Sequence, residues 1–402
     1  MESKIYNEFN QKLLIGKNNL IEKIKIFLYK QNKSFFDNYD FNNDLIYLEP
    51  LLFAGITSKK KENIDNILFS YSKDLETDIK TNSKGYFYIP KIGYFFTELK
   101  EQKFTIQKKG SEFYIYTDTD TNCFEIEFKF EKIKIIQNKF ELLNYPLDIL
   151  HQHFFDEFGT DVPVEIIEIS KKQEHNLSIA LSIIKLNSPT WYKLLSDNVQ
   201  SIVIFNDSSK KRNSFATQSV HGCIFLNSFQ DDYNEVFFIE DIAHQGGHVI
   251  FNTYLSSDVN PFLMHKNTEI YLRGERDKYN EPRALYVMLH AMYTYESIFT
   301  CFNACLKNNV FNGQKKHELL GRLTFTLLKF ERDLDLLMDK DEKGNNVYFT
   351  SEGIDLINEF VNNYNMCLSN WGNEIKNLNL TNQSYNFSYT SFLELNPLEK
   401  CY

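Results

Sequence analysis

Apolar residues follow a helical spacing at the start of the chain and then alternate with polar residues. Residues 5–30 place Leu, Ile and Phe three or four positions apart, which predicts one or two amphipathic helices. Alternation at 86–89, 113–116 and 124–130, with turn residues at 109–110 and 118–122, predicts an antiparallel β-meander within residues 85–136. The chain is therefore expected to open with a helix and a β-rich subdomain.

After about residue 144 the helical spacing returns, at 147–158, 173–186 and 191–195. Two short apolar runs, 201–205 and 222–226, predict strands, with a polar loop between them. Further helices are predicted near 233–254, 282–306, 318–338 and 352–375, and residues 377–390 are expected to be loosely structured. The pattern predicts two domains: 1–143, a helix plus β-meander with a hypothetical role in peptide recognition, and 144–402, mainly helical and catalytic.

Composition narrows the class of protein. Of 402 residues, 43% are hydrophobic and 15% aromatic, which is enough to bury a large core. A formal net charge of −10 argues against a broad nucleic-acid or anionic-membrane surface. The six cysteines are scattered, the N-terminus does not resemble a signal peptide, and no stretch approaches the roughly 20 apolar residues of a membrane helix. A cytoplasmic protein without nucleic-acid or membrane partners is expected; its oligomeric state is open.

The strongest chemical signal lies in the helix predicted at 233–254, where His244 and His248 stand four residues apart. That spacing places both imidazoles on one helix face, as in the H-E-x-x-H helix of zinc peptidases. Gln245 occupies the position of the glutamate that removes a proton from zinc-bound water, and an amide cannot do so. A strand pair leading into such a helix is familiar in zincins, so the predicted fold class is α+β with a mainly helical, zincin-like metal-binding domain.

A catalytic metal needs a third ligand, and His290 is the best candidate. It lies 42 residues beyond His248, in the middle of the apolar helix predicted near 282–306. A core histidine bonded to a neighbour is the alternative interpretation of this residue. Glu296 and Glu281 are carboxylates that would replace or supplement it, and a 2-His-1-carboxylate set favours non-haem iron.

Arginine is concentrated shortly before that helix, as Arg273, Arg276 and Arg283. A guanidinium suits bidentate capture of a carboxylate. Arg283 would lie about two helical turns from His290, where it is placed to hold the far carboxylate of a dicarboxylic co-substrate. The alternative for each arginine is a solvated ion pair with Asp277 or Glu281.

Two further features of the 233–254 helix leave alternatives open. Gly246 and Gly247 each cost about 1 kcal/mol relative to alanine in a helix, so a substrate, a cofactor or a crossing helix is expected to approach there. Glu240, one turn before His244, either orients that imidazole or faces solvent.

The run from about 201 to 300 resembles the HExxH-type putative peptide-modification proteins, understood as 2-oxoglutarate-dependent β-hydroxylases of ribosomally made peptides. The matching pieces are the strand at 219–226, the helix with His244 and His248, and an approach through Arg276 and Pro282–Arg283 to the sequence Leu-His-x-x-Tyr-x-Tyr at 289–295. The resemblance implies that the three histidines bind Fe(II), that Arg283 binds 2-oxoglutarate, and that a precursor peptide is hydroxylated at a side-chain Cβ.

Two other functions remain open from the sequence. One is a zinc hydrolase whose general base is another carboxylate, such as Glu240 or Glu296. The other is a non-catalytic peptide-binding protein on a degenerate zincin scaffold. The peptide, the modified residue, the stereochemistry, the metal and the effect of Gln245 are not specified by the sequence.

Overall fold

The computed structural model describes residues 4–60, 62–110, 112–116, 127–156, 158–207, 211–270 and 283–398, with side chains from residue 8 onward. Contacts divide the chain into two compact units. Unit 1 comprises Met1–Leu13, Gln173–Asp197 and Gln230–Tyr402; unit 2 comprises Leu14–Lys172 and Asn198–Phe229. Helices and antiparallel sheets both occur, in agreement with the predicted α+β class.

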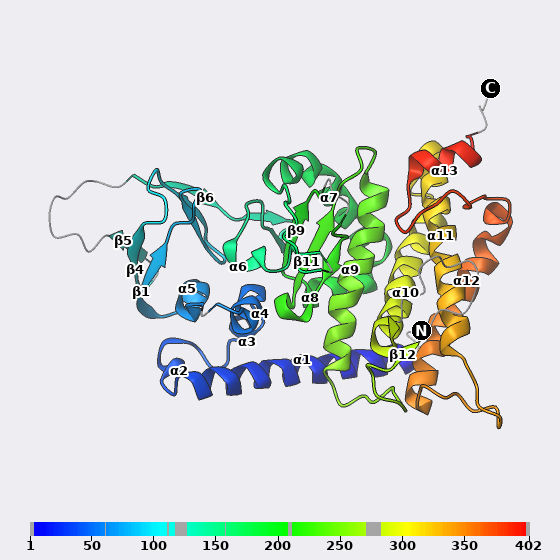
Figure 1. Ribbon diagram of the computed structural model, residues 1–402, viewed down its shortest axis with the longest axis horizontal. Coiled ribbons are helices and arrows are strands. Elements are labelled where there is room, and N and C mark those ends of the chain that lie inside the picture. The colour runs from blue at the N-terminus through cyan, green and yellow to red at the C-terminus, as the bar shows by residue number, and fades with distance from the viewer. Residues whose placement is uncertain are drawn as a thin grey trace. The chain divides into compact units, whose positions relative to one another are not determined.

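Unit 1 is almost entirely helical (Figure 1). The segment Met1–Leu13 carries the start of α1, and α10 packs against α9, α11 and α12. A two-stranded ladder pairs Ile270 with Arg283 immediately before α10. The elements of this unit, wholly or in large part, are α7 (Ile167–Asn187), α8 (Pro189–Asn198), α9 (Glu235–Leu255), β12 (Glu269–Ile270), β13 (Arg283–Ala284), α10 (Leu285–Lys307), α11 (Gly313–Leu337), α12 (Ser351–Ile375) and α13 (Tyr389–Leu395).

Helices α9 and α10 form the centre of unit 1 because their sequences are apolar around most of the circumference. A helix of that kind is buried rather than laid on a surface. Most residues of both helices are buried, among them Phe251 and Phe299, which are wholly inaccessible. The side chain of Asn234 caps α9 by accepting a hydrogen bond from the Val236 amide at 2.7 Å. The positions predicted for both helices, 233–254 and 282–306, are confirmed to within a few residues.

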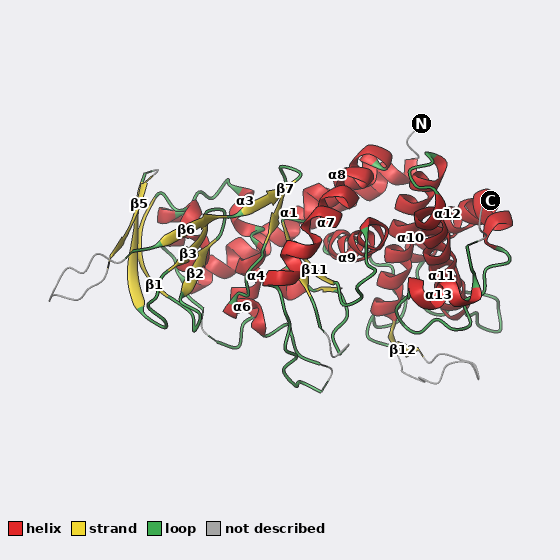
Figure 2. Ribbon diagram, turned by 90° about the horizontal axis from the view of Figure 1, so that it is seen from above, coloured by secondary structure: helices red, strands yellow, loops and turns green. Residues whose placement is uncertain are grey.

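In the part of unit 2 that the structure describes there are three sheets, whose strands are drawn in yellow in Figure 2. Two are three-stranded and antiparallel, in the orders β1-β4-β5 and β2-β3-β6; the third has the order β10-β11-β9-β8-β7. The strands are β1 (Asp74–Lys80), β2 (Tyr86–Ile89), β3 (Gly93–Phe96), β4 (Lys103–Lys109), β5 (Glu112–Tyr116), β6 (Lys129–Lys132), β7 (Lys134–Ile136), β8 (Phe140–Leu142), β9 (Ser201–Phe205), β10 (Phe215–Ala216) and β11 (Cys223–Asn227).

The long N-terminal helix α1 (Lys4–Gln31) belongs to unit 2 from residue 14 onward. The other helices described in unit 2 are short: α2 (Phe35–Asn38), α3 (Asp44–Tyr47), α4 (Pro50–Thr57), α5 (Ile64–Leu68) and α6 (Asp148–His151), with 3₁₀ turns η1 (Phe69–Tyr71) and η2 (Gln218–Val220). The predicted N-terminal helix is confirmed as one continuous helix. The helix predicted at 147–158 is only the single turn α6.

Strand pairing corrects the predicted meander. Antiparallel pairing is confirmed, and Gly110 turns the β4–β5 hairpin with φ 61. However, β4 pairs with β1 and β3 pairs with β6, so the strands are not joined in simple succession. The turn predicted at 118–122 lies outside the described residues. Side-chain alternation identifies strands but not their partners, because pairing depends on contacts between distant segments.

The unit boundary also differs from the one drawn at residue 143. β9 pairs in parallel with both β8 and β11, so residues 198–229 share a sheet with the β-rich part of the chain. In the described ranges, no helix has the length and apolar character that crossing a membrane requires. Four cysteines, Cys223, Cys301, Cys305 and Cys367, are buried free thiols.

Candidate metal centre

Helix α9 brings His244 and His248 onto one face, as their spacing predicted. Their ring centroids are 5.1 Å apart, one helical turn, and both side chains are partly buried. Both histidines therefore face the interior of unit 1 at a helix-determined separation.

His290 of α10 lies directly opposite His248. Their Nδ1 atoms are 3.4 Å apart, and the rings are stacked at 5.6 Å between centroids with an interplanar angle of 23°. The structure thus places His290 against His248, from two helices that pack along each other, while His244 lies one turn from His248.

The two glycines of α9 allow this close packing. A Cβ on Gly247 would lie 3.0 Å from Ser297 Oγ and 3.4 Å from the Thr294 Cα of α10. A Cβ on Gly246 would collide with the Leu195 side chain of α8. Of the alternatives left open by the sequence, neighbouring helices therefore account for both glycines.

The surroundings of His290 are aromatic. Its ring centroid lies 4.3 Å from that of Tyr286 and 4.9 Å from that of Phe251, whose ring meets it edge-on. The Tyr286 hydroxyl donates a hydrogen bond to Asn252 Oδ1 at 2.6 Å, which fixes the tyrosine between the two helices. Within the described ranges, the buried Nε2 of His290 has no hydrogen-bond partner. Other buried side-chain atoms of the described residues, such as Trp191 Nε1 and Gln245 Oε1, are also without a partner, so this nitrogen alone does not identify a ligand.

Burial keeps all three imidazoles neutral at physiological pH. It lowers the pKa of His248 to about 4 and holds the pKa values of His244 and His290 well below the usual value. The mutual repulsion of their positive charges lowers the values for His244 and His290 further. A neutral imidazole is the form that binds a metal.

The donor set fits a transition metal in chemistry and, for one pair, in spacing. Two nitrogens bound to one ion at about 2.1 Å are separated by about 3.0–3.4 Å, and the facing Nδ1 atoms of His248 and His290 are 3.4 Å apart. As the side chains stand, no set of three or more His, Cys, Asp or Glu side chains in the described segments closes around a common point.

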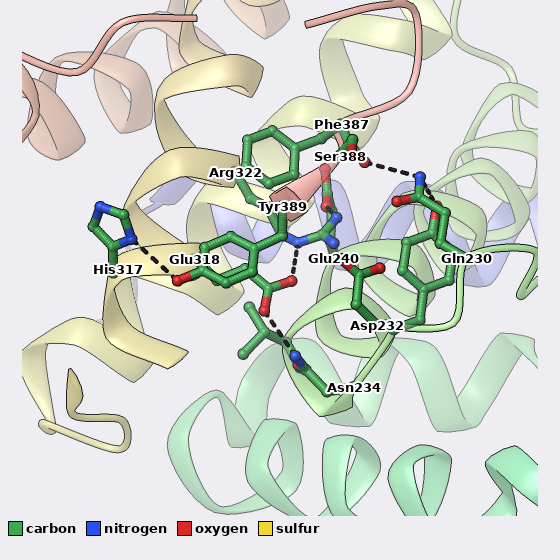
Figure 3. A network of polar contacts seen from close by, with 12 residues as sticks. Gln230, Asp232, Asn234, Glu240, His317, Glu318, Arg322, Phe387, Ser388 and Tyr389 are labelled. Carbon is green, nitrogen blue, oxygen red and sulfur yellow. Dashed lines mark hydrogen bonds and ion pairs between the residues drawn. The ribbon is translucent and has the colours of Figure 1, made fainter. Parts of the chain in front are cut away.

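The carboxylate of Glu240 belongs to a different contact network, drawn in Figure 3. It accepts a hydrogen bond from Nη1 of Arg322 at 2.7 Å, while Nε of the same arginine donates to Glu318 Oε1 at 2.8 Å. Arg322 and Glu318 are buried, and Asn234 Nδ2 donates to the other Glu318 oxygen at 2.7 Å. The arginine also lies over the Phe387 ring, 4.9 Å from its centroid. Glu240 thus ties α9 to α11.

The other carboxylates considered from the sequence are also accounted for or not described. Glu296 accepts hydrogen bonds from Thr300 Oγ1 and Asn363 Nδ2, both at 3.0 Å, and burial raises its pKa. It therefore faces α12. Glu281 lies outside the described residues. Gln245 is buried, and its amide nitrogen donates to Asp241 Oδ1 at 3.2 Å.

Of the three candidate arginines, only Arg283 is described; Arg273 and Arg276 lie outside the described residues. Arg283 stands in β13, just before α10, and its Nη1 is 3.9 Å from Oδ2 of the fully buried Asp333. The alternative of pairing with Asp277 or Glu281 falls in the undescribed segment. The helix α10, which carries His290, begins two residues later at Leu285, so Arg283 lies just outside the helix start at which it was expected.

Sequence reasoning missed the part of this region that α11 contributes. Lys329, Arg332 and Asp333 were predicted only as polar positions of an amphipathic helix. The charge of Lys329 contributes to the lowered pKa of His244, after burial and the charge of His248. No local pattern distinguishes such residues from solvated charges. Comparison with known proteins adds no assignment, since no protein family and no curated protein sequence matches this chain.

Proposed function

We propose that this protein is an Fe(II)- and 2-oxoglutarate-dependent oxygenase that hydroxylates a side-chain β-carbon of a ribosomally made peptide in the cytoplasm. In this proposal unit 1 is a zincin-like catalytic scaffold related to the HExxH-type peptide-modification proteins. His244, His248 and His290 would hold the iron, and Arg283 would bind the far carboxylate of 2-oxoglutarate.

One observation carries the proposal most directly. His248 and His290, 42 residues apart in sequence, place their Nδ1 atoms 3.4 Å apart between two packed helices. That separation suits two nitrogens bound to one ion as well as a hydrogen bond between the rings. In this proposal the pair binds one ion.

Each protein group has a defined task in this proposal. The three neutral imidazoles supply the ligands, and the crossing at Gly247 fixes the distance between the two helices that carry them. Phe251 and Tyr286 cover His290 and exclude water from it. Bound iron with 2-oxoglutarate would supply dioxygen activation, a reaction that does not require a glutamate at position 245.

Peptide recognition is proposed for the β-rich region of unit 2. Strand β5 is an edge of its sheet, and Tyr114 and Tyr116 on it are exposed. An edge strand offers unpaired backbone groups to which an extended peptide can add, while exposed aromatic rings contact its side chains.

The two alternative functions receive less support. A zinc hydrolase needs a displaced base, but Glu240 is engaged by Arg322 and Glu296 by Thr300 and Asn363. A purely binding protein assigns no task to the neutral histidine pair His248–His290.

Mass spectrometry of a candidate precursor peptide, co-expressed with this chain, tests the proposal. The expected result is a gain of one oxygen atom on the peptide, lost in the His248→Ala variant and retained in His265→Ala, a change of an exposed loop histidine. Cleavage of the peptide would instead establish hydrolysis. An unmodified peptide that still binds the chain would establish the non-catalytic function.

A further inference from the structure

Three cationic side chains gather near the buried carboxylate of Asp333. Arg332 donates from Nε and Nη2 to Oδ1 of Asp333, both at 3.0 Å, and the Tyr295 hydroxyl donates to Oδ2 at 3.2 Å. Arg283 approaches Oδ2 only to 3.9 Å, beyond hydrogen-bond distance. Asp333 therefore positions the Arg283 guanidinium without occupying its donors.

Lys329, one turn before Asp333 on α11, is the third cation. Its ammonium donates to the Tyr385 carbonyl at 2.9 Å and lies over the rings of Phe325 and Tyr385, at 4.2 and 5.0 Å from their centroids. No carboxylate in the described segments lies within ion-pair distance of it. The carboxylates of Glu240 and Asp333 act on it from a longer distance, and both are engaged by arginines. A partly buried ammonium without an ion-pair partner of its own is costly, so this position favours an anionic ligand.

The same ammonium connects this cluster with the histidines. Its charge acts on His244, and the charges of Glu240, Arg332, Asp333 and Arg283 in turn act on Lys329. Burial lowers the pKa of Lys329 to about 8, so the side chain remains mostly charged at pH 7. Lys329 is thus within electrostatic reach of His244 and of the Arg283–Asp333 pair, in a chain whose net charge is −10.

We propose that Lys329 acts with Arg283 to bind a small dicarboxylic acid beside the three histidines. Arg283 offers a planar fork and Lys329 a point charge, a combination that suits the carboxylates of one compact ligand. Asp333, Arg332 and Tyr295 are positioning residues for Arg283. The choice of a dicarboxylic acid rests on the proposed function, but binding through these two cations does not require iron.

Titration calorimetry of metal-free protein with glutarate tests this inference. Glutarate has two carboxylates but no keto group with which to chelate a metal. The wild-type chain is expected to bind glutarate, and to bind the monocarboxylate butyrate about tenfold more weakly, which is about 1.4 kcal/mol. Lys329→Met is expected to weaken glutarate binding by a similar factor.

Two further variants separate charge from fold. Lys316→Met removes the same charge from α11 at a position paired with Glu374, 3.0 Å away, and should leave glutarate affinity unchanged. Lys329→Arg keeps the charge and should stay within about threefold of wild type, or less than 1 kcal/mol. If Lys329→Met fails to fold, two measurements still test the proposal: the glutarate affinity of Lys329→Arg relative to wild type, and the ratio of glutarate to butyrate affinity in the wild type.

Three results would overturn the inference: no glutarate binding by the wild type, equal affinity for butyrate, or wild-type affinity in a folded Lys329→Met. Equal affinity for butyrate would indicate a site for single carboxylates, such as acidic peptide side chains. Because iron is absent from the titration, a failure of the oxygenase proposal leaves this test unaffected, and the reverse also holds.

Discussion

At the scale of single residues, burial determines which histidines stay neutral at physiological pH. Those of α9 and α10 stay neutral because water is excluded from them. His265, in contrast, is exposed in the loop after α9, where its Nδ1 accepts a hydrogen bond from the Asn267 amide at 3.3 Å. The residue type is the same in both environments, and the difference in burial follows from whether the histidine lies on a core helix or in a loop.

Removing one histidine should abolish stable iron binding. His248→Ala and His290→Ala each leave two imidazoles, which rarely hold a catalytic metal. We expect each variant to retain little iron after anaerobic reconstitution and desalting, measured by elemental analysis, while His265→Ala retains the wild-type amount. Full iron content in His290→Ala would assign the third ligand to another residue.

A buried histidine of unit 2 should make stability depend on pH. His221 packs near Phe53, and burial lowers its pKa from 6.5 to about 4. The unfolded chain therefore takes up the proton first, and stability is lost as pH falls from about 6.5 toward 4. At pH 5 the loss is about 2 kcal/mol relative to pH 7, by the linkage relation.

Chemical denaturation at pH 7 and pH 5 measures this effect. His221→Gln, which cannot be protonated, should reduce the difference between the two free energies of unfolding by about 2 kcal/mol. An unchanged difference in the variant would show that His221 does not govern the acid sensitivity.

At the scale of elements, the crossing of α9 and α10 determines the geometry of the candidate site. Gly247→Leu should force the helices apart, lower stability by about 1–3 kcal/mol and weaken iron binding, because His248 and His290 lie on opposite sides of that crossing. Gly372→Leu in α12 is the matched control, since nothing lies within 4 Å of a Cβ there. Urea unfolding that shows equal stability for both variants would contradict the tight crossing.

The ion network between α9 and α11 should be sensitive to loss of its arginine. Arg322→Met leaves the buried Glu318 without its cation, which we expect to cost about 3–5 kcal/mol of stability. Neutralising the partners as well, in Arg322→Met with Glu318→Gln and Glu240→Gln, should recover part of that loss. If the triple variant is no more stable than the single one, packing rather than charge explains the effect.

Elements with a continuous apolar pattern could be predicted from the sequence, whereas their partners could not. α9, α10, β9 and β11 lie close to their predicted positions because periodicity is a local property. The pairing of β3 with β6, and the contact of Arg322 with Glu240, join distant segments. The spacing of the candidate histidines identified them in the sequence. The closeness of Asp333 to Arg283, and the place of Lys329 one turn before Asp333, depend on the packing of α11 against α10, which the sequence pattern does not show.

At the scale of the whole molecule, each unit is assembled from separate stretches of sequence. The histidines, Arg283 and Lys329 all belong to unit 1, while the sheets with exposed edge aromatics belong to unit 2. A single boundary at residue 143 could not describe this arrangement, because the chain enters unit 1 more than once. Amino-acid composition predicts that a chain can bury a core, but not which of its segments belong to which structural unit.

The central claim is that the three histidines bind Fe(II) in a form that accepts 2-oxoglutarate. Anaerobic titration of the metal-free protein with Fe(II) in the presence of 2-oxoglutarate, followed by visible absorption, tests it most directly. We predict a metal-to-ligand charge-transfer band that saturates with iron and is missing in His290→Ala. An iron-loaded wild-type protein without this band, or an undiminished band in His290→Ala, would contradict the account.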